Sequence, residues 1–252
     1  MDHDFEDVEF KINAPELLEE KLKSKRRRSM IGTGAMSDPY IPIPESLELT
    51  RACLKLIEKY RFGLAIQTKS SLILRDLEIL KSINHRAKCV VQMTLTTFDE
   101  ELCKIIEPNV STSRERFHTL KTFKDEGIST VVWLDPLLPF INDSTDNLKG
   151  ILNYCIEAGV YGIICFGMGM TLREGSREYF YKNLDRHFPG LKTRYEKKFG
   201  NSYIIISDNN SELLALFHKT CADNNIISDI DKVFEYLNSY EEKPENVQKE
   251  LF

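Results

Sequence analysis

The residues best placed for chemistry are polar or small residues that close short apolar runs. Five such runs end in a polar or glycine-rich tip, with a helical stretch between one run and the next. The tips carry Ser37, Asp38, Thr68, Lys69, Thr94, Asp135 and Gly167. Strands that alternate with helices are typically parallel, and their carboxyl ends then lie on one face, where active sites are built. We therefore expect these residues to gather on one face.

Lys69 closes the apolar run of residues 62–70, and Gln67 lies two positions earlier on the same side of the expected strand. A lysine at a strand end can bind a carboxylate or a phosphate, or form a Schiff base if burial lowers its pKa. It can equally be a solvated residue at the start of a loop. The residue type alone leaves these alternatives open.

The run of residues 89–97 alternates polar and apolar side chains. Its polar positions are Gln92, Thr94 and Thr96, and its apolar positions are Val91, Met93 and Leu95. A strand of this pattern either lines a polar cavity or lies at a sheet edge with one face in water, because buried parallel strands are usually apolar on both faces.

Common catalytic motifs are missing from the sequence. The glycines of GTG (residues 32–34) and FGMGM (residues 166–170) permit close backbone approach. Neither stretch matches the dinucleotide fingerprint or the phosphate-binding loop, and there is no GxSxG or HExxH. The five histidines fall in expected loops or helices, where solvation is the expectation.

The elements that position the tips follow from hydrophobic periodicity. Strands are predicted within residues 29–39, 62–70, 89–97, 130–136 and 161–170, and later at 202–207. Helices are predicted at 13–25, 45–60, 72–83, 99–107, 114–126, 148–158, 211–224 and 231–240. Asn13 is the expected N-cap of the first helix, and Gly127 and Gly159 are expected to close two others. We expect a frayed, charged tail at residues 241–252.

Composition narrows the class of protein. A chain of 252 residues with 42% hydrophobic residues can bury a large core, and β/α proteins of this size usually fold as one domain. The net charge of −5 argues against a protein held on nucleic acid mainly by bulk charge. The apolar stretches are too short to span a bilayer, and the start of the chain is acidic rather than signal-like. No membrane association and a cytoplasmic location are therefore expected.

The cysteines and a basic run near the N-terminus each have a simple structural interpretation. The six cysteines form no CxxC pair, so we expect reduced and mostly buried thiols rather than a metal site. The basic run KSKRRRS (residues 23–29) ends the first helix, where cations offset the helix dipole. A phosphate-facing patch is the alternative for that run.

Taken in order, several stretches resemble the radical S-adenosylmethionine superfamily, in its spore photoproduct lyase-like branch. They are residues 32–51 (GTGAMSDPYIPIPESLELTR), 68–80 (TKSSLILRDLEIL), 102–108 (LCKIIEP), Arg116 and 136–143 (PLLPFIND). With the helices between them they cover residues 8 to 220. The resemblance implies an α/β fold, a partial parallel (β/α)6 barrel, here without its first strand and cluster loop. It also implies a core over residues 1–190, with residues 191–252 extending the same domain.

The resemblance also implies ligands. Members bind S-adenosylmethionine and a [4Fe–4S] cluster, cleave the former reductively and abstract hydrogen from a substrate. The cofactor-binding residues implied are Ser37, Asp38, Lys69, Gln92, Thr94, Asp135 and Gly167. Ser37 and Asp38 would lie at the methionyl amino group, and Lys69 would lie at the methionyl carboxylate. Gln92 and Thr94 would lie near the ribose. Asp135 and Gly167 would lie beside the adenosine. No catalytic residue is assigned.

One departure from the family pattern decides what activity to expect. Three cysteines in a CxxxCxxC loop ligate the family's cluster, and this sequence contains no such triplet. The first tip matches the family's second strand, so we expect a chain truncated at its N-terminus and inactive as written, with no metal ligands. If active, it would need an electron donor such as flavodoxin or ferredoxin. The substrate is unknown, with nucleic acid suggested by family analogy.

Two other functions stay open. One is a barrel remnant that binds S-adenosylmethionine or a nucleotide without catalysis. The other is a lyase that uses Lys69 as a Schiff-base nucleophile.

Overall fold

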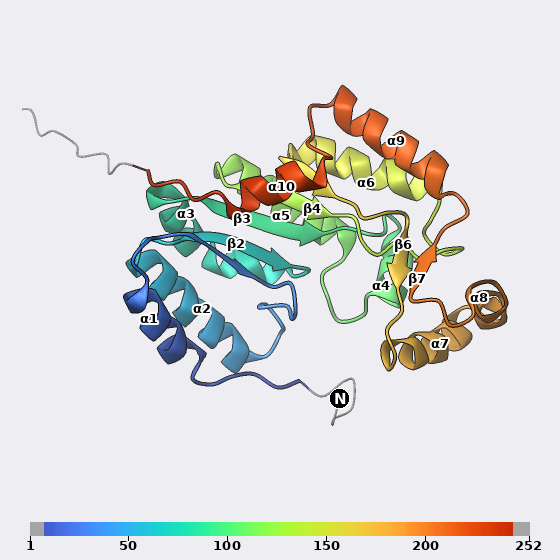
Figure 1. The fold of residues 1–252 in the computed structure, drawn as a ribbon, viewed down its shortest axis with the longest axis horizontal. Coiled ribbons are helices and arrows are strands. Elements are labelled where there is room, and N and C mark those ends of the chain that lie inside the picture. Colours follow the sequence, from blue (N-terminus) through green and yellow to red (C-terminus); the bar gives the residue numbers. More distant parts are fainter. Residues whose placement is uncertain (1–7, 244–252) are drawn as a thin grey trace, which may run out of the picture.

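A computed structural model of the protein, which describes residues 8–243, contains a five-stranded parallel sheet. The strands are β1 (Met30–Thr33), β2 (Gly63–Thr68), β3 (Cys89–Thr94), β4 (Ser129–Trp133) and β5 (Gly162–Ile164), and they lie side by side in sequence order (Figure 1). Helices connect them, as the alternating pattern predicts. The α/β class is thereby confirmed, whereas the partial-barrel form and the division at residue 190 stay predictions.

Helices cover both faces of this sheet. On one face the helices are α1 (Ala14–Ser24), α2 (Pro44–Lys59), α3 (Leu77–Arg86), α5 (Ser113–Asp125), α6 (Thr145–Ala158) and α9 (Asn210–Asp223). Their apolar side chains form one core with strand residues such as Ile66, Val91 and Val132. On the other face lies α10 (Ile230–Asn238) (Figure 1). Its Val233 and Leu237 pack against the sheet.

The remaining elements lie beyond the carboxyl ends of the strands. They are the 3-10 helix η1 (Ser71–Asp76), α4 (Glu100–Ile106), β6 (Gly169–Thr171), α7 (Ser176–His187), α8 (Leu191–Phe199) and β7 (Ile204–Ile206). β6 and β7 form a small antiparallel sheet. Tyr195 and Leu184 fill a third core beneath it with Leu172 and Ile205. Among the described helices none is long and apolar enough to cross a membrane.

The expected run of residues 161–170 does not form one strand. It divides into β5 and β6, which belong to different sheets, because the chain turns at Gly167 with φ of 135°. Gly169 must then lie against β7, where a Cβ atom would come within 2.0 Å of the Ile205 carbonyl oxygen. The expected helix at 72–83 is likewise two elements, η1 and α3.

Helix ends agree with the sequence in part. Gly159 adopts the left-handed conformation that ends α6, as predicted. Gly127, also at positive φ, follows the C-cap residue of α5 rather than forming it. Asn13 precedes α1 but its side chain makes no capping hydrogen bond. The best-capped helix is instead α5, where Thr112 and Glu115 form a capping box.

β3 is a central strand, paired with β2 on one side and β4 on the other. Gln92, Thr94 and Thr96 are all buried, so the alternative of an edge strand with one wet face is wrong. The polar side of β3 therefore lies inside the protein. The expected frayed tail lies mostly outside the described residues, as does His3.

Candidate ligand-binding site at the carboxyl ends of the strands

Asp38 ties the loop after β1 to the end of β2. Its carboxylate accepts hydrogen bonds from the Thr68 hydroxyl at 2.6 Å, the Lys69 backbone nitrogen at 2.7 Å and the Tyr40 backbone nitrogen at 2.9 Å. The loop can approach β2 because Gly34 has no side chain: a Cβ atom there would lie 1.9 Å from the Gln67 carbonyl oxygen. Asp38 thus fixes the conformation of the loop, and its carboxylate already accepts three hydrogen bonds.

Ser37 lies on the same loop and is exposed to solvent. Ser37 and Asp38 lie on the loop that follows the edge strand β1, while Lys69 directly follows the adjacent strand β2. The structure therefore brings this loop and Lys69 together at the carboxyl ends of β1 and β2.

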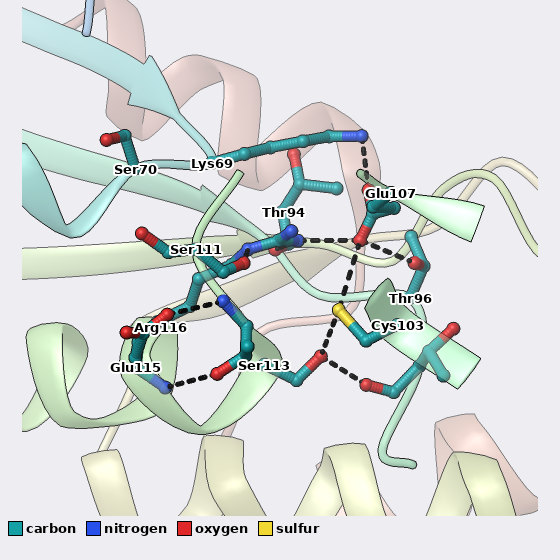
Figure 2. Close-up of polar contacts among 12 residues, drawn as sticks. Lys69, Ser70, Thr94, Thr96, Cys103, Glu107, Ser111, Ser113, Glu115 and Arg116 are labelled. Carbon is teal, nitrogen blue, oxygen red and sulfur yellow. Dashed lines mark hydrogen bonds and ion pairs between the residues drawn. The ribbon is translucent and has the colours of Figure 1, made fainter. Parts of the chain in front are cut away.

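The Lys69 ammonium forms an ion pair with Glu107, the residue that follows α4 (Figure 2). The Lys69 side chain is 34% exposed, whereas that of Glu107 is only 9% exposed. Burial alone would raise the pKa of Glu107, but the charges and hydrogen bonds of Lys69 and Arg116 hold its pKa below the ordinary value. Glu107 is therefore an ionised carboxylate inside the protein.

Arg116 holds Glu107 from the buried side (Figure 2). Its Nη1 donates to Glu107 Oε2 at 2.8 Å and to the Thr94 carbonyl oxygen at 3.0 Å, and its Nε donates to the Ser111 carbonyl oxygen at 2.7 Å. The Arg116 side chain is fully buried, and its Nη2 has no hydrogen-bond partner among the described residues. A cation is thus fixed behind the carboxylate that Lys69 contacts.

Gln92 and Thr94 lie on β3, between the charged group at β2 and the next strand. Gln92 Oε1 accepts a hydrogen bond from Trp133 Nε1 at 2.9 Å, which orients the amide along the sheet. The Thr94 side chain is buried, and its carbonyl oxygen is bound by Arg116. β3 therefore connects the charged end of the site with an aromatic end at β4.

Asp135 follows β4 and accepts a hydrogen bond from the Phe166 backbone nitrogen at 2.9 Å. Burial raises the pKa of Asp135 to about 6, against a smaller lowering effect of that hydrogen bond. The peptide bond from Asp135 to Pro136 is cis. Asp135 and Gly167 both line a cavity of about 430 Å³, whose other walls include Phe166 and the side chains of the small β6–β7 sheet.

The sequence-derived residues therefore form two groups along one edge. Lys69 and its partners lie at β2, and Asp135 and Gly167 lie at β4 and β5. Adjacent strands are separated by about 4.8 Å, so the ends of β2 and β5 are about 14 Å apart across three spacings. A cationic side chain thus lies at the end of β2, and a cavity with mostly apolar walls lies beside β4 and β5.

Glu107 and Arg116 are functional candidates that the sequence did not assign a role. Both lie within the stretches that carry the family resemblance. Nothing in the spacing of Lys69, Glu107 and Arg116 shows that they meet, because they come from three different elements. Their charges and their place in those stretches were the only signals.

The described residues do not fit a [4Fe–4S] cluster. No group of three or more His, Cys, Asp or Glu side chains suited to a metal ion occurs in residues 8–243. The six cysteines are free thiols; Cys53 is half-buried and the others are buried, as predicted. Burial raises the pKa of Cys89 and of Cys165 to about 12, as expected for thiols enclosed in the core.

Comparison with known proteins identifies sequence relatives of this chain and a solved structure that shares its fold. No family model matches the chain. An uncharacterized protein of Methanocaldococcus jannaschii is 35% identical over 136 residues, which is 54% of this chain and 49% of that protein. An uncharacterized protein of Mycobacterium tuberculosis is 27% identical over 193 residues, or 76% of this chain and 56% of the relative. The chain thus spans about half the length of the curated relatives it matches.

Among solved structures, spore photoproduct lyase in complex with dinucleoside spore photoproduct aligns with a TM-score of 0.55. The alignment is 12% identical and covers 83% of this chain and 63% of the lyase. SuiB of Streptococcus suis bound to S-adenosylmethionine aligns less well, with a TM-score of 0.40 and 15% identity over 69% of this chain and 40% of SuiB. This chain shares the fold of the lyase.

Proposed function

We propose that the chain binds S-adenosylmethionine along the carboxyl edge of the sheet. The observation that carries the proposal is the order of the groups: an ammonium at β2, an amide at β3, and a glycine-lined cavity beside β4 and β5. These groups occur in a fold shared with spore photoproduct lyase. The methionyl carboxylate would bind Lys69, and the adenosine would enter the cavity beside Asp135 and Gly167.

The groups between these ends complete the proposed binding mode. The oriented amide of Gln92 and the buried Thr94 lie between the two ends and would approach the ribose. The loop of Ser37 and Asp38 would approach the methionyl amino group, with Asp38 holding the loop and the exposed Ser37 free to turn toward the ligand. In this arrangement the residues bind and orient the ligand and exclude water from its flat end.

In enzymes of this kind, bound S-adenosylmethionine supplies a 5′-deoxyadenosyl radical on reduction. That activity needs three cysteine ligands, which residues 8–243 do not bring together. We propose that cleavage, the unknown substrate and an electron donor such as flavodoxin or ferredoxin all depend on ligands supplied from outside these residues. By analogy with the lyase, nucleic acid is the substrate class to test first.

Isothermal titration calorimetry with S-adenosylmethionine tests the binding proposal. The wild-type chain is expected to bind, and Lys69→Ala is expected to weaken binding at least tenfold, because a charge-assisted contact is lost. Lys59→Ala is the matched control, since Lys59 also pairs with a glutamate, Glu19, but on the outer helices. Absence of wild-type binding, or equal affinities for the two variants, would refute the proposed site. Assay for 5′-deoxyadenosine separates binding from cleavage.

A Schiff-base lyase is less well supported by the geometry. The Lys69 nitrogen is held as an ammonium against Glu107, whereas an amine nucleophile must be unprotonated. Borohydride trapping with carbonyl substrates is expected to leave no adduct on Lys69. A trapped adduct at this residue would favour the lyase instead.

A further inference from the structure

We propose that Arg116, without touching the ligand, sets the charge of the subsite at Lys69 so that this subsite takes a carboxylate. The inference rests on the proposed function, because it concerns the methionyl end of the same ligand. It makes Arg116 a positioning residue that acts through Glu107.

The charges at this subsite do not balance. Lys69 and Arg116 are two cations that share a single carboxylate, Glu107, through its two oxygens. Cys103 and Thr96 are the other side chains in contact with that carboxylate, and both are neutral. The group of three therefore carries one net positive charge, which one carboxylate from a ligand would neutralise.

Arg116 is the residue that makes the net charge of this group positive. If only Lys69 and Glu107 were present they would form a neutral pair, and a ligand carboxylate would meet repulsion from Glu107 as well as attraction to Lys69. The Arg116 charge lies within the protein, where screening by water and salt is weak. It therefore offsets Glu107 without occupying the surface that the ligand needs.

Arg116 is also fixed in place. Its guanidinium donates to the carbonyl oxygens of Thr94 and Ser111, one on β3 and one just before α5. The capping box of Thr112 and Glu115 holds the start of α5, so the arginine enters from a defined turn. Among the described residues Glu107 is the one carboxylate that pairs with Arg116, and the Nη2 atom has no hydrogen-bond partner.

Asp38 is the other charged group near Lys69, and its role is different. Its carboxylate accepts hydrogen bonds from the Lys69 backbone nitrogen, from the Thr68 hydroxyl at the end of β2 and from the Tyr40 backbone nitrogen on the loop. A carboxylate beside a positively charged subsite matches the zwitterionic end of an amino acid, with its ammonium toward Asp38 and its carboxylate toward Lys69. The pair of charges would favour that end over a simple anion.

The test combines variants with two ligands, S-adenosylmethionine and its decarboxylated form, S-adenosylmethioninamine. Arg116→Gln is expected to weaken binding of S-adenosylmethionine about tenfold or more, the effect of one unit charge several ångströms away at an effective dielectric of about 20. Binding of the decarboxylated ligand is expected to change much less. The double variant Glu107→Gln with Arg116→Gln restores one net positive charge and is expected to recover most of the affinity.

Further variants keep the test decisive if Arg116→Gln fails to fold. Arg116→Lys retains the charge and is expected to bind S-adenosylmethionine nearly as the wild type does. Glu107→Gln raises the net charge and is expected to improve the preference for the carboxylated ligand. Equal losses for the two ligands in these variants would mean a structural role only and would overturn the inference. If the wild type binds neither ligand, the proposed function itself fails, and the inference fails with it.

Discussion

Asp135 makes folding stability depend on pH in a direction that is unusual for a carboxylate. Paired aspartates usually stabilise the folded state when ionised, but burial raises the pKa of Asp135 to about 6 in the folded protein. Its value in an unfolded chain is about 3.9. The folded state therefore binds the proton more tightly than the unfolded state does, and ionisation of Asp135 costs folding free energy.

The size of the effect follows from the two values. A difference of about two pKa units corresponds to about 3 kcal/mol at a pH above both values, and partial exposure of the side chain reduces this toward 2 kcal/mol. This stability is present below pH 4 and is lost as the pH rises to about 6. Asp135→Asn removes the ionisation and retains an oxygen that can accept from the Phe166 backbone nitrogen.

We expect Asp135→Asn to be more stable than the wild type at pH 8, by about 2–3 kcal/mol. The advantage is expected to shrink by about 2 kcal/mol when the pH is lowered to 4.5. Urea unfolding followed by circular dichroism at the two pH values measures it. Asp185→Asn is the matched control, because Asp185 is exposed on α7. A difference between Asp135→Asn and wild type that is the same at both pH values would refute the reasoning.

Two substitutions and one labelling experiment test the packing of the fold. Thr112→Ala removes the capping box of α5 and is expected to cost about 1 kcal/mol in urea unfolding, whereas Thr122→Ala within the same helix is expected to cost less. Phe217→Ala on α9 leaves a cavity in the main core and is expected to cost about 3–5 kcal/mol, so an effect below 1 kcal/mol would contradict the packing. Thiols with raised pKa react slowly with Ellman's reagent at pH 8 until urea is added; rapid native labelling would contradict their burial. These thiols are Cys89, Cys155, Cys165 and Cys221.

The sheet and most of its helices could be predicted because their side chains follow the periodicity of the element. β2 and β4 are apolar runs of the length expected for buried strands, and α2 has a regular apolar stripe. The strand within residues 161–170 could not be divided in advance, because its apolar residues serve two sheets in turn. Only the conformation at Gly167 and the close approach at Gly169 reveal the break.

The position of Lys69 was predictable, but its partners were not. Its place at a strand end follows from a local pattern, and the family resemblance suggested a carboxylate as its ligand. Glu107 follows a short helix, and Arg116 lies on a helix with an amphipathic pattern, where a charged side chain is usually solvated. Their burial depends on contacts between elements that the sequence pattern does not specify.

The same contacts explain why the ligand preference of such a site depends on the net charge of its side chains, which a sequence motif does not reveal. A lone lysine at a strand end binds anions of many kinds, and a lysine paired with a glutamate binds few. The second cation, Arg116, comes from a helix two elements further along the chain than β3, and packing alone places it behind Glu107. Because the arginine is buried while Lys69 is partly exposed, one charge can be adjusted without altering the surface that a ligand meets. If the proposed binding mode holds, selectivity for a carboxylate depends on α5, which carries Arg116, as much as on β2, which precedes Lys69.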